Sequence, residues 1–207
     1  GQRAHETTEN WIADISGKGD EIPNHLPLNH SEVVVRRYQL IPEGGKLPPP
    51  EELPEDIRRN NFGNTYKRLH RKRPSLTLVP GNNAFPIHPV LDRSLTPREA
   101  ARLQTFPDNF ILHGNRKNQC IQIGNAIPPL LGKVLGKSAL KHAKQYSNMA
   151  NSKKLPKYKT KTAIGESSIP IASISKLRSK DGFLDLFSGA GGIMMGFAKA
   201  GWRPLLV

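Results

Sequence analysis

The chain has 207 residues, of which 36% are hydrophobic, and carries a formal net charge of +14 with a pI of about 10.1. Its single cysteine, Cys120, excludes a disulfide framework and a cysteine-built zinc site, and no apolar run approaches the roughly 20 residues of a membrane helix. We therefore expect an intracellular protein with an acidic partner. Double-stranded DNA is the first candidate, because neutralised phosphates release counterions; a basic ribosomal-type or merely soluble surface explains the charge equally well.

The first part of the chain, to about residue 65, is rich in proline and predicts loops rather than long regular elements. Within it, the segment Glu32–Tyr38 allows two interpretations. Its β-branched residues favour a strand, whereas Asn29 or Ser31 as an N-cap favours a short helix. Beyond it, Ser75–Val79 predicts a short strand that ends at the turn Pro80–Asn83.

Two helices follow. Thr96 as N-cap, Pro97 at the first helical position and Glu99 in the first turn predict a helix that ends near residues 106–108. A second helix is expected from about residue 127 through Leu140, with apolar residues on one face. Its other face carries lysines at positions 133, 137, 141 and 144.

A Lys- and Ser-rich stretch without apolar periodicity comes next and predicts a solvated linker, whose lysines are either a plain tether or phosphate contacts. The last block returns to order as strand, glycine-rich turn, helix and strand. Glycines that follow a strand and open a helix let a ligand approach the backbone, although any tight turn also favours them. The pattern is neither G-x-G-x-x-G nor Gly-Lys-Ser/Thr. Phe187 beside it suits an adenosyl group, or simply packs the strand end.

Three segments together resemble a known family. DLFSGAGGIMMGFAKAGW resembles the first motif of DNA cytosine-5 methyltransferases, which binds S-adenosylmethionine, LDRSLTPREAARLQTFPDNF their ninth motif and QIGNAIPPLLGKVLG their tenth. NTYKRLHRKRPSLTL and NHSEVVVRRYQLIPEGG are similar to parts of the family's target-recognition domain. Here the ninth and tenth motifs precede the first, an order that resembles the circularly permuted members.

The resemblance implies an α/β fold: a partial Rossmann-like S-adenosylmethionine-dependent methyltransferase with a loop-rich, mixed α/β target-recognition domain. Residues 1–92 would form the target-recognition region and 93–147 the ninth- and tenth-motif helices. Residues 148–180 would form a basic flexible linker, and 181–207 the start of the cofactor-binding domain.

The resemblance also implies functional residues. The cofactor would be lined by Asp185, Phe187, Ser188, Gly189, Ala190, Gly191 and Gly192, together with Asn125 of the tenth motif, which is otherwise a cap or turn residue. The DNA contacts would come from Tyr66, Lys67, Arg68, Arg71, Thr77 and Arg93, for which a solvated charge run, internal ion pairs or a plain strand threonine are the alternatives. For Arg98 and Arg102 we favour structural roles. No metal site is expected.

The catalytic Pro-Cys-Gln and Glu-Asn-Val motifs of the family do not occur in this sequence. Cys120 follows a glutamine rather than a proline, and we expect it to be a buried structural residue without a role as nucleophile. The whole enzyme, in the bacterial cytoplasm, would methylate cytosine C5 at a specific duplex site, as in restriction-modification. We favour a truncated, permuted methyltransferase; a subunit of a split enzyme that needs a catalytic partner and a non-catalytic DNA-binding module are the alternatives.

Overall fold

The computed structural model describes residues 5–59, 66–79, 85–151, 182–184, 192–201 and 203–206. Contacts within the chain divide it into two compact units, Gly1–Ala126 and Ile127–Val207, called unit 1 and unit 2 below. Within the described residues, no helix combines the length and the apolar character needed to cross a membrane.

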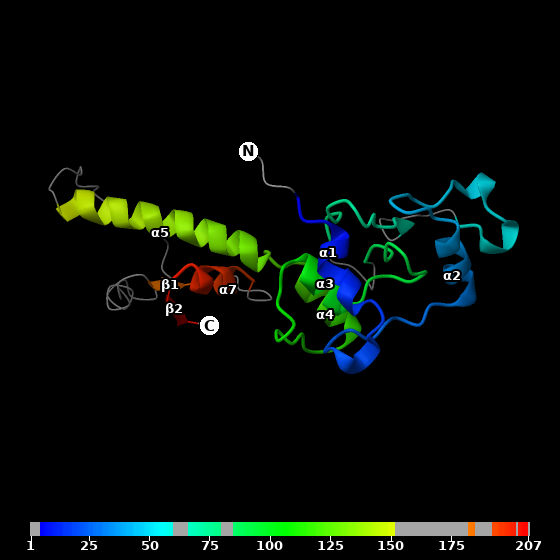
Figure 1. Ribbon diagram of the computed structural model, residues 1–207, viewed down its shortest axis with the longest axis horizontal. Helices are drawn as coiled ribbons and strands as arrows, with labels where there is room; N and C mark the ends of the chain where they lie inside the picture. The colour runs from blue at the N-terminus through cyan, green and yellow to red at the C-terminus, as the bar shows by residue number, and fades with distance from the viewer. Residues whose placement is uncertain are drawn as a thin grey trace, which may run out of the picture. The chain divides into compact units, whose positions relative to one another are not determined.

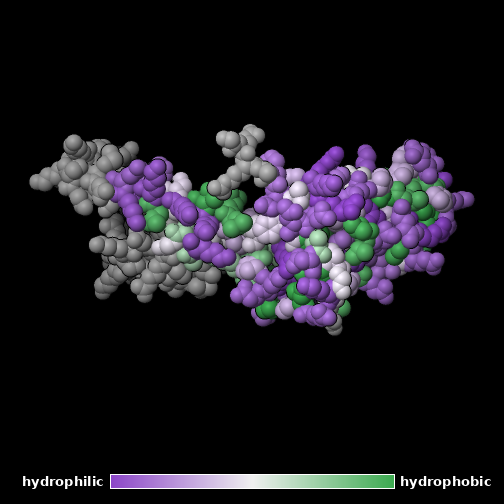
Figure 2. Space-filling model, in the orientation of Figure 1, coloured by the Kyte–Doolittle hydropathy of each residue, from purple (hydrophilic) through white to green (hydrophobic). Residues whose placement is uncertain are grey.

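Unit 1 consists of short helices joined by long loops (Figure 1). Its α-helices are α1 (Thr8–Ile12), α2 (Glu32–Gln39), α3 (Pro97–Leu103) and α4 (Arg116–Gly124), and its 3-10 turns are η1 (Ala13–Ile15), η2 (Gly19–Glu21), η3 (Pro50–Glu52) and η4 (Glu55–Ile57). Helix α3 contacts both α1 and α4, whereas α2 contacts η4. Polar residues cover most of the visible face of this unit, with smaller apolar patches between them (Figure 2).

Helix α3 begins as the sequence predicts. Thr96 is its N-cap, Pro97 takes the first position, and the Thr96 hydroxyl accepts a hydrogen bond from the Glu99 backbone N–H at 3.1 Å. The Glu99 carboxylate accepts one in return from the Thr96 N–H at 2.8 Å, which completes a capping box. The helix ends at Leu103, a few residues before the predicted end.

The segment Glu32–Gln39 is a helix, so the second of its two interpretations is correct. Its N-cap is Ser31, although the serine side chain makes no capping hydrogen bond. The apolar face of this helix packs against loops that are distant in sequence and so contributes to a core. Local β propensity does not predict such packing. The core residues are Tyr38, Ile41, Leu47, Leu53, Tyr66 and Ile87, with Val34 packed against them.

Two other predictions need correction. Ser75–Val79 is not a strand. β-branched and apolar residues favour a strand only where a neighbouring strand accepts the pairing, and in the described part of unit 1 the pairing consists of isolated bridges elsewhere, such as Lys46 with Lys67. Helix α4 was not predicted. Its N-cap Asn115, which accepts a hydrogen bond from the Asn118 N–H at 3.0 Å, was the available sequence signal.

Unit 2 contains α5 (Pro129–Asn151), β1 (Gly182–Leu184), α7 (Gly192–Lys199) and β2 (Arg203–Leu206). Helix α5 starts where the sequence predicts but runs to Asn151, past the predicted start of the linker, because good helix formers such as alanine, lysine and glutamine continue there. Strands β1 and β2 are parallel and α7 lies between them in the chain, so the predicted order of strand, helix and strand is confirmed, whereas the predicted glycine-rich turn lies outside the described residues.

Glycines set how closely α5 and α7 pack. A Cβ placed on Gly196 of α7 would lie only 2.5 Å from the Gly132 carbonyl carbon and the Lys133 nitrogen of α5. A Cβ on Gly136 would lie 3.0 Å from the Ala200 Cβ. The helices therefore touch backbone to backbone, and the contact depends on the absence of a side chain at Gly196.

Candidate nucleic-acid interface

A run of exposed cations lies at the end of the predicted target-recognition region. Lys67, Arg71, Lys72 and Arg73 are exposed, and the exposed Thr77 follows them; these five residues are called the basic segment below. Backbone hydrogen bonds hold its start on both sides: the Ile87 N–H donates to the Lys67 carbonyl at 2.8 Å, and the Leu47 N–H donates to the Tyr66 carbonyl at 3.1 Å. These hydrogen bonds therefore restrain the main chain that carries the exposed cations.

Arg68, within the same run, points inward and is 5% exposed. All five of its N–H groups donate hydrogen bonds of 2.7–3.0 Å. Four of them reach main-chain carbonyls and the fifth reaches Asp92 Oδ1. The acceptor carbonyls belong to Tyr38, Ile41, His88 and Leu91. Arg68 therefore ties α2 to the loop after residue 87, and its predicted DNA contact stays a prediction that these bonds disfavour.

Arg71 is exposed but paired. Its guanidinium donates to both carboxylate oxygens of Glu43 at 3.0 and 3.1 Å, and its backbone N–H donates to Oε1 at 2.7 Å. These bonds lower the pKa of Glu43 to about 2. The ion pair with Glu43 keeps the Arg71 guanidinium in place at the surface. Tyr66, which precedes the basic segment, is buried within the core rather than exposed.

Arg93 is fixed by Glu99, which is fully buried. Two guanidinium nitrogens donate to the Glu99 carboxylate at 2.7 and 2.8 Å. Burial would raise the pKa of Glu99, but the hydrogen bonds and charge of Arg93 outweigh it, so the pKa is lowered. The same carboxylate closes the capping box of α3, and the Thr96 hydroxyl also bonds His25 Nδ1 at 2.8 Å. The DNA contact predicted for Arg93 stays a prediction, since its side chain is only 13% exposed.

Arg98 and Arg102 have the structural roles that we favoured. Arg98 is fully buried and donates to the carbonyls of Pro23, Pro107 and Phe110. Arg102 forms a double hydrogen bond with Asp108 at 2.7 and 2.5 Å and a further one with Asp14. The Asp108 hydrogen bonds raise the pKa of Arg102 well above its ordinary value. Together these contacts fasten α3 to the loops on either side.

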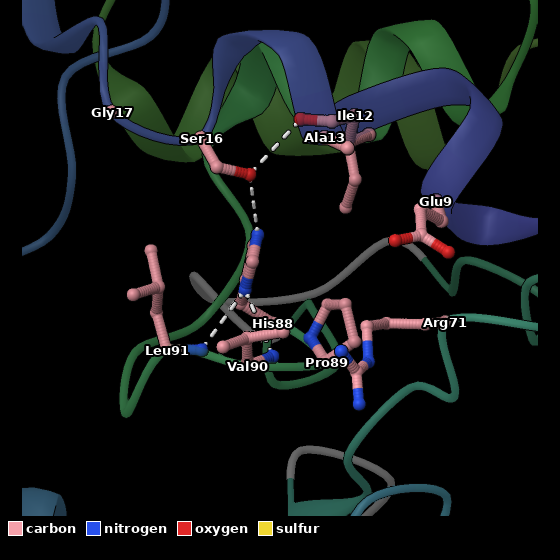
Figure 3. A pocket seen from close by; sticks show the side chains of 10 residues that line it. All are labelled: Glu9, Ile12, Ala13, Ser16, Gly17, Arg71, His88, Pro89, Val90 and Leu91. Atoms are coloured by element: carbon pink, nitrogen blue, oxygen red, sulfur yellow. Dashed lines mark hydrogen bonds between the residues drawn. The ribbon is translucent and has the colours of Figure 1, made fainter.

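A pocket of about 350 Å³ lies between α1 with η1 and the loop after residue 87 (Figure 3). Buried His88 stands in its wall. His88 Nδ1 accepts hydrogen bonds from the Val90 and Leu91 N–H groups, so Nε2 carries the proton and donates to Ser16 Oγ at 3.0 Å. Burial lowers the pKa of His88 to about 4. With both ring nitrogens occupied, this histidine is built to fix the loop rather than to move protons.

No local sequence pattern indicates the roles of His25 and His88. Each bonds a residue more than 70 positions away, His25 to Thr96 and His88 to Ser16. Both histidines therefore help to hold distant segments of unit 1 together.

The residues proposed to line the cofactor are only partly described. Asp185, Phe187, Ser188, Gly189, Ala190 and Gly191 lie outside the described residues. Gly192 is the first residue of α7 and is buried. Asn125 is the exposed C-cap of α4, and its N–H donates to the Ile121 carbonyl at 3.1 Å. The cofactor contacts of both residues stay predictions.

Cys120 is buried in α4 at 1% exposure, as expected. Burial raises the pKa of its thiol, so the reactive thiolate is disfavoured. No group of three or more His, Cys, Asp or Glu side chains within the described ranges is placed to hold a metal ion.

Comparison with known proteins assigns the family. The model of the C-5 cytosine-specific DNA methylase family matches residues 3–141, which is most of the chain. The chain belongs to this DNA methylase family. The family has the fold of S-adenosylmethionine-dependent methyltransferases, and the helical, loop-rich architecture is consistent with the partial α/β domain that the sequence predicts.

Named DNA methylases of the same kind share this region. The type II methyltransferase M1.HphI of Haemophilus parahaemolyticus is 35% identical over 127 residues, which cover 61% of this chain and 33% of that protein. M.NgoFVII of Neisseria gonorrhoeae is also 35% identical, over 66% of this chain and 39% of its own length. The chain thus spans about a third to two fifths of these relatives.

A third methylase is matched over most of its own length. The type II methyltransferase M.AquIB of Picosynechococcus is 34% identical over 132 residues, which cover 58% of this chain but 89% of that protein. The family match ends at residue 141, so the block with the first-motif pattern lies beyond it. The permuted motif order and the predicted domain boundaries stay predictions.

Proposed function

We propose that the chain supplies the DNA-reading part, and the start of the cofactor site, of an enzyme that transfers a methyl group from S-adenosylmethionine to C5 of cytosine in a specific duplex site. A restriction-modification system is the proposed context, since the related proteins are named type II methyltransferases. The observation that carries the proposal is the family match over residues 3–141, which includes the whole basic segment.

The basic segment is the proposed phosphate-binding surface. Lys67, Lys72 and Arg73 are exposed cations on a backbone that is hydrogen-bonded to neighbouring loops, and Thr77 offers a hydroxyl group. Phosphate contacts of this kind position a protein on the duplex, and base contacts then specify the sequence. An enzyme that modifies a base must also take it out of the stack, at a cost of a few kcal/mol, so a firmly held duplex is required.

The described residues fit a cofactor site in one respect. Parallel strands β1 and β2 are connected through α7, and the glycine-rich sequence that is expected to form a loop stands between the end of β1 and the start of that helix. Ligands of α/β folds bind at the carboxyl ends of parallel strands, beside such a loop. S-adenosylmethionine, when bound there, would supply the methyl group.

Methyl transfer also needs a nucleophile, and this chain offers none of the required kind. Its one cysteine is buried and has a raised pKa. The catalytic groups would therefore come from residues outside this sequence, on the same or on a second polypeptide. The coverage of 89% of M.AquIB favours the second arrangement as a candidate, because that methyltransferase is little longer than the region it shares with this chain.

The proposal is tested by gel retardation and by methyl transfer. The chain should bind duplex DNA with an affinity that falls as the salt concentration rises. The single variants Lys67→Ala and Lys72→Ala should each reduce the slope of log K against log salt concentration by about 0.9. Lys18→Ala, an exposed lysine outside the basic segment, is the matched control. Labelled methyl incorporation should require a second polypeptide that carries the Pro-Cys motif. Incorporation by this chain alone, or equal effects of all three lysines, would contradict the proposal.

A further inference from the structure

A second pocket in unit 1 lies against the basic segment. Its volume is about 380 Å³, at the lower end of the range of ligand sites and enough for a single nucleobase. Three stretches that are distant in sequence form it: residues 6–11, which include Trp11 of α1, residues 74–78 with Thr77, and the end of α3 with Leu103 and its C-cap Gln104.

The side chains in this pocket suit a flat, polar-edged ring. Trp11 is half-buried and provides an aromatic wall, while Leu103 adds apolar surface. The lining also has polar side chains, among them the exposed Thr77 hydroxyl, the Gln104 amide and the Glu6 carboxylate. Amide and carboxylate groups form hydrogen bonds with the amino and ring-nitrogen edges of bases. An aromatic face binds any base by stacking.

The aromatic wall is held rigidly relative to the basic segment. The Thr8 N–H and hydroxyl both donate to the Arg73 carbonyl at 2.9 Å, and the Glu9 N–H donates to the Arg71 carbonyl at 3.1 Å. Arg102 donates to the Trp11 carbonyl at 3.2 Å from the side of α3. A site fixed in this way loses little conformational freedom when a ligand binds.

Charge indicates where such a ring would come from. Lys72 and Arg73, directly before the pocket in the chain, are exposed cations, whereas Arg71 beside them is paired with Glu43. A nucleotide whose phosphate contacts these cations would have its base near the pocket. A free ring without a phosphate would gain nothing from them.

We propose that the pocket of Trp11, Thr77 and Gln104 binds an unstacked nucleobase of DNA, with Trp11 as the stacking partner. The proposal rests on the proposed DNA-binding function and adds a base-binding residue to it. Single strands and locally opened duplexes are the expected ligands, because a paired base cannot enter a pocket of this size.

Intrinsic fluorescence tests the proposal in the full chain. The chain has two tryptophans, so Trp202→Phe leaves Trp11 as the reporter. Short single-stranded DNA should quench its emission in a saturable way, at lower concentration than a free deoxynucleotide does. Trp11→Leu should weaken single-strand binding roughly 5- to 150-fold, the loss expected for one base–aromatic stack. Trp11→Phe keeps a ring and should retain most of the affinity, with thermal unfolding checked for each variant.

The outcomes separate the two proposals. Retarded DNA with unchanged Trp11 emission, or equal affinities of Trp11→Leu and Trp11→Phe, overturns the pocket while DNA binding stands. Quenching by the free nucleotide alone overturns DNA as the source of the base. Absence of any retarded DNA overturns the proposed function itself, and the pocket assignment falls with it.

Discussion

Substitution of Arg68 by methionine should destabilise unit 1 strongly. The change removes five hydrogen bonds, four of them to main-chain carbonyls; of these carbonyls, that of Tyr38 keeps a second donor, the Ile41 N–H at 2.9 Å. Loss of one partner from a buried charged contact costs about 3–5 kcal/mol. Asp92 is 37% exposed and regains water, which keeps the loss within that range rather than above it. Because a domain has only about 5–15 kcal/mol of stability, the variant should be close to unfolding at room temperature.

Urea unfolding followed by circular dichroism measures the loss. Arg68→Lys should cost less, about 2–3 kcal/mol, because an ammonium keeps the charge and up to three donors. Arg36→Met is the matched control, since its ion pair with Asp56 is exposed and should contribute at most about 1 kcal/mol. A variant Arg68→Met that unfolds within about 1 kcal/mol of the parent, yet binds DNA less tightly, would refute the structural role and favour the DNA contact.

Three further predictions follow from single contacts. Gly196→Ala should destabilise the α5–α7 contact by about 1–3 kcal/mol through overpacking, whereas Gly17→Ala, with open space around it, should be close to neutral in thermal unfolding. Stability should fall as pH drops from 6.5 toward about 4, because His88 must take up a proton on unfolding and its folded pKa is lowered; His88→Gln should flatten that part of the pH profile. Thr96→Ala should cost about 1–2 kcal/mol in urea, and Thr7→Ala, whose side chain makes no capping bond, should cost almost nothing. Equal losses in either matched pair, or an unchanged pH profile, would contradict the respective contact.

Local rules predicted the elements that local forces stabilise. The start of α3 follows from Thr96, Pro97 and Glu99, because a capping box and an N-terminal proline act within four residues. The block around Gly192 was likewise predictable, since a glycine turn between apolar segments is characteristic of a strand that leads into a helix. Local rules failed at Ser75–Val79, because a strand requires a pairing partner and this segment pairs with no other strand in the described part of unit 1.

The candidate site was only partly predictable for a similar reason. Sequence composition treats all cations of a run alike, whereas the fold separates them: Lys67 is exposed and Arg68, its neighbour, is buried. The acceptors of Arg68 are 20–30 positions away, so no window of local sequence contains them. The place of Trp11 in a pocket is not predictable from local sequence either, because its neighbours there come from residues 74–78 and 103–104.

The buried arginines of unit 1 influence which of its residues can change during evolution. Arg68 and Arg98 bond mainly to main-chain carbonyls, which every amino acid carries. Side chains along those loops can be exchanged while the guanidinium contacts beneath them persist. Unit 1 can therefore change the residues of its surface without having to rebuild the contacts that hold its loops together.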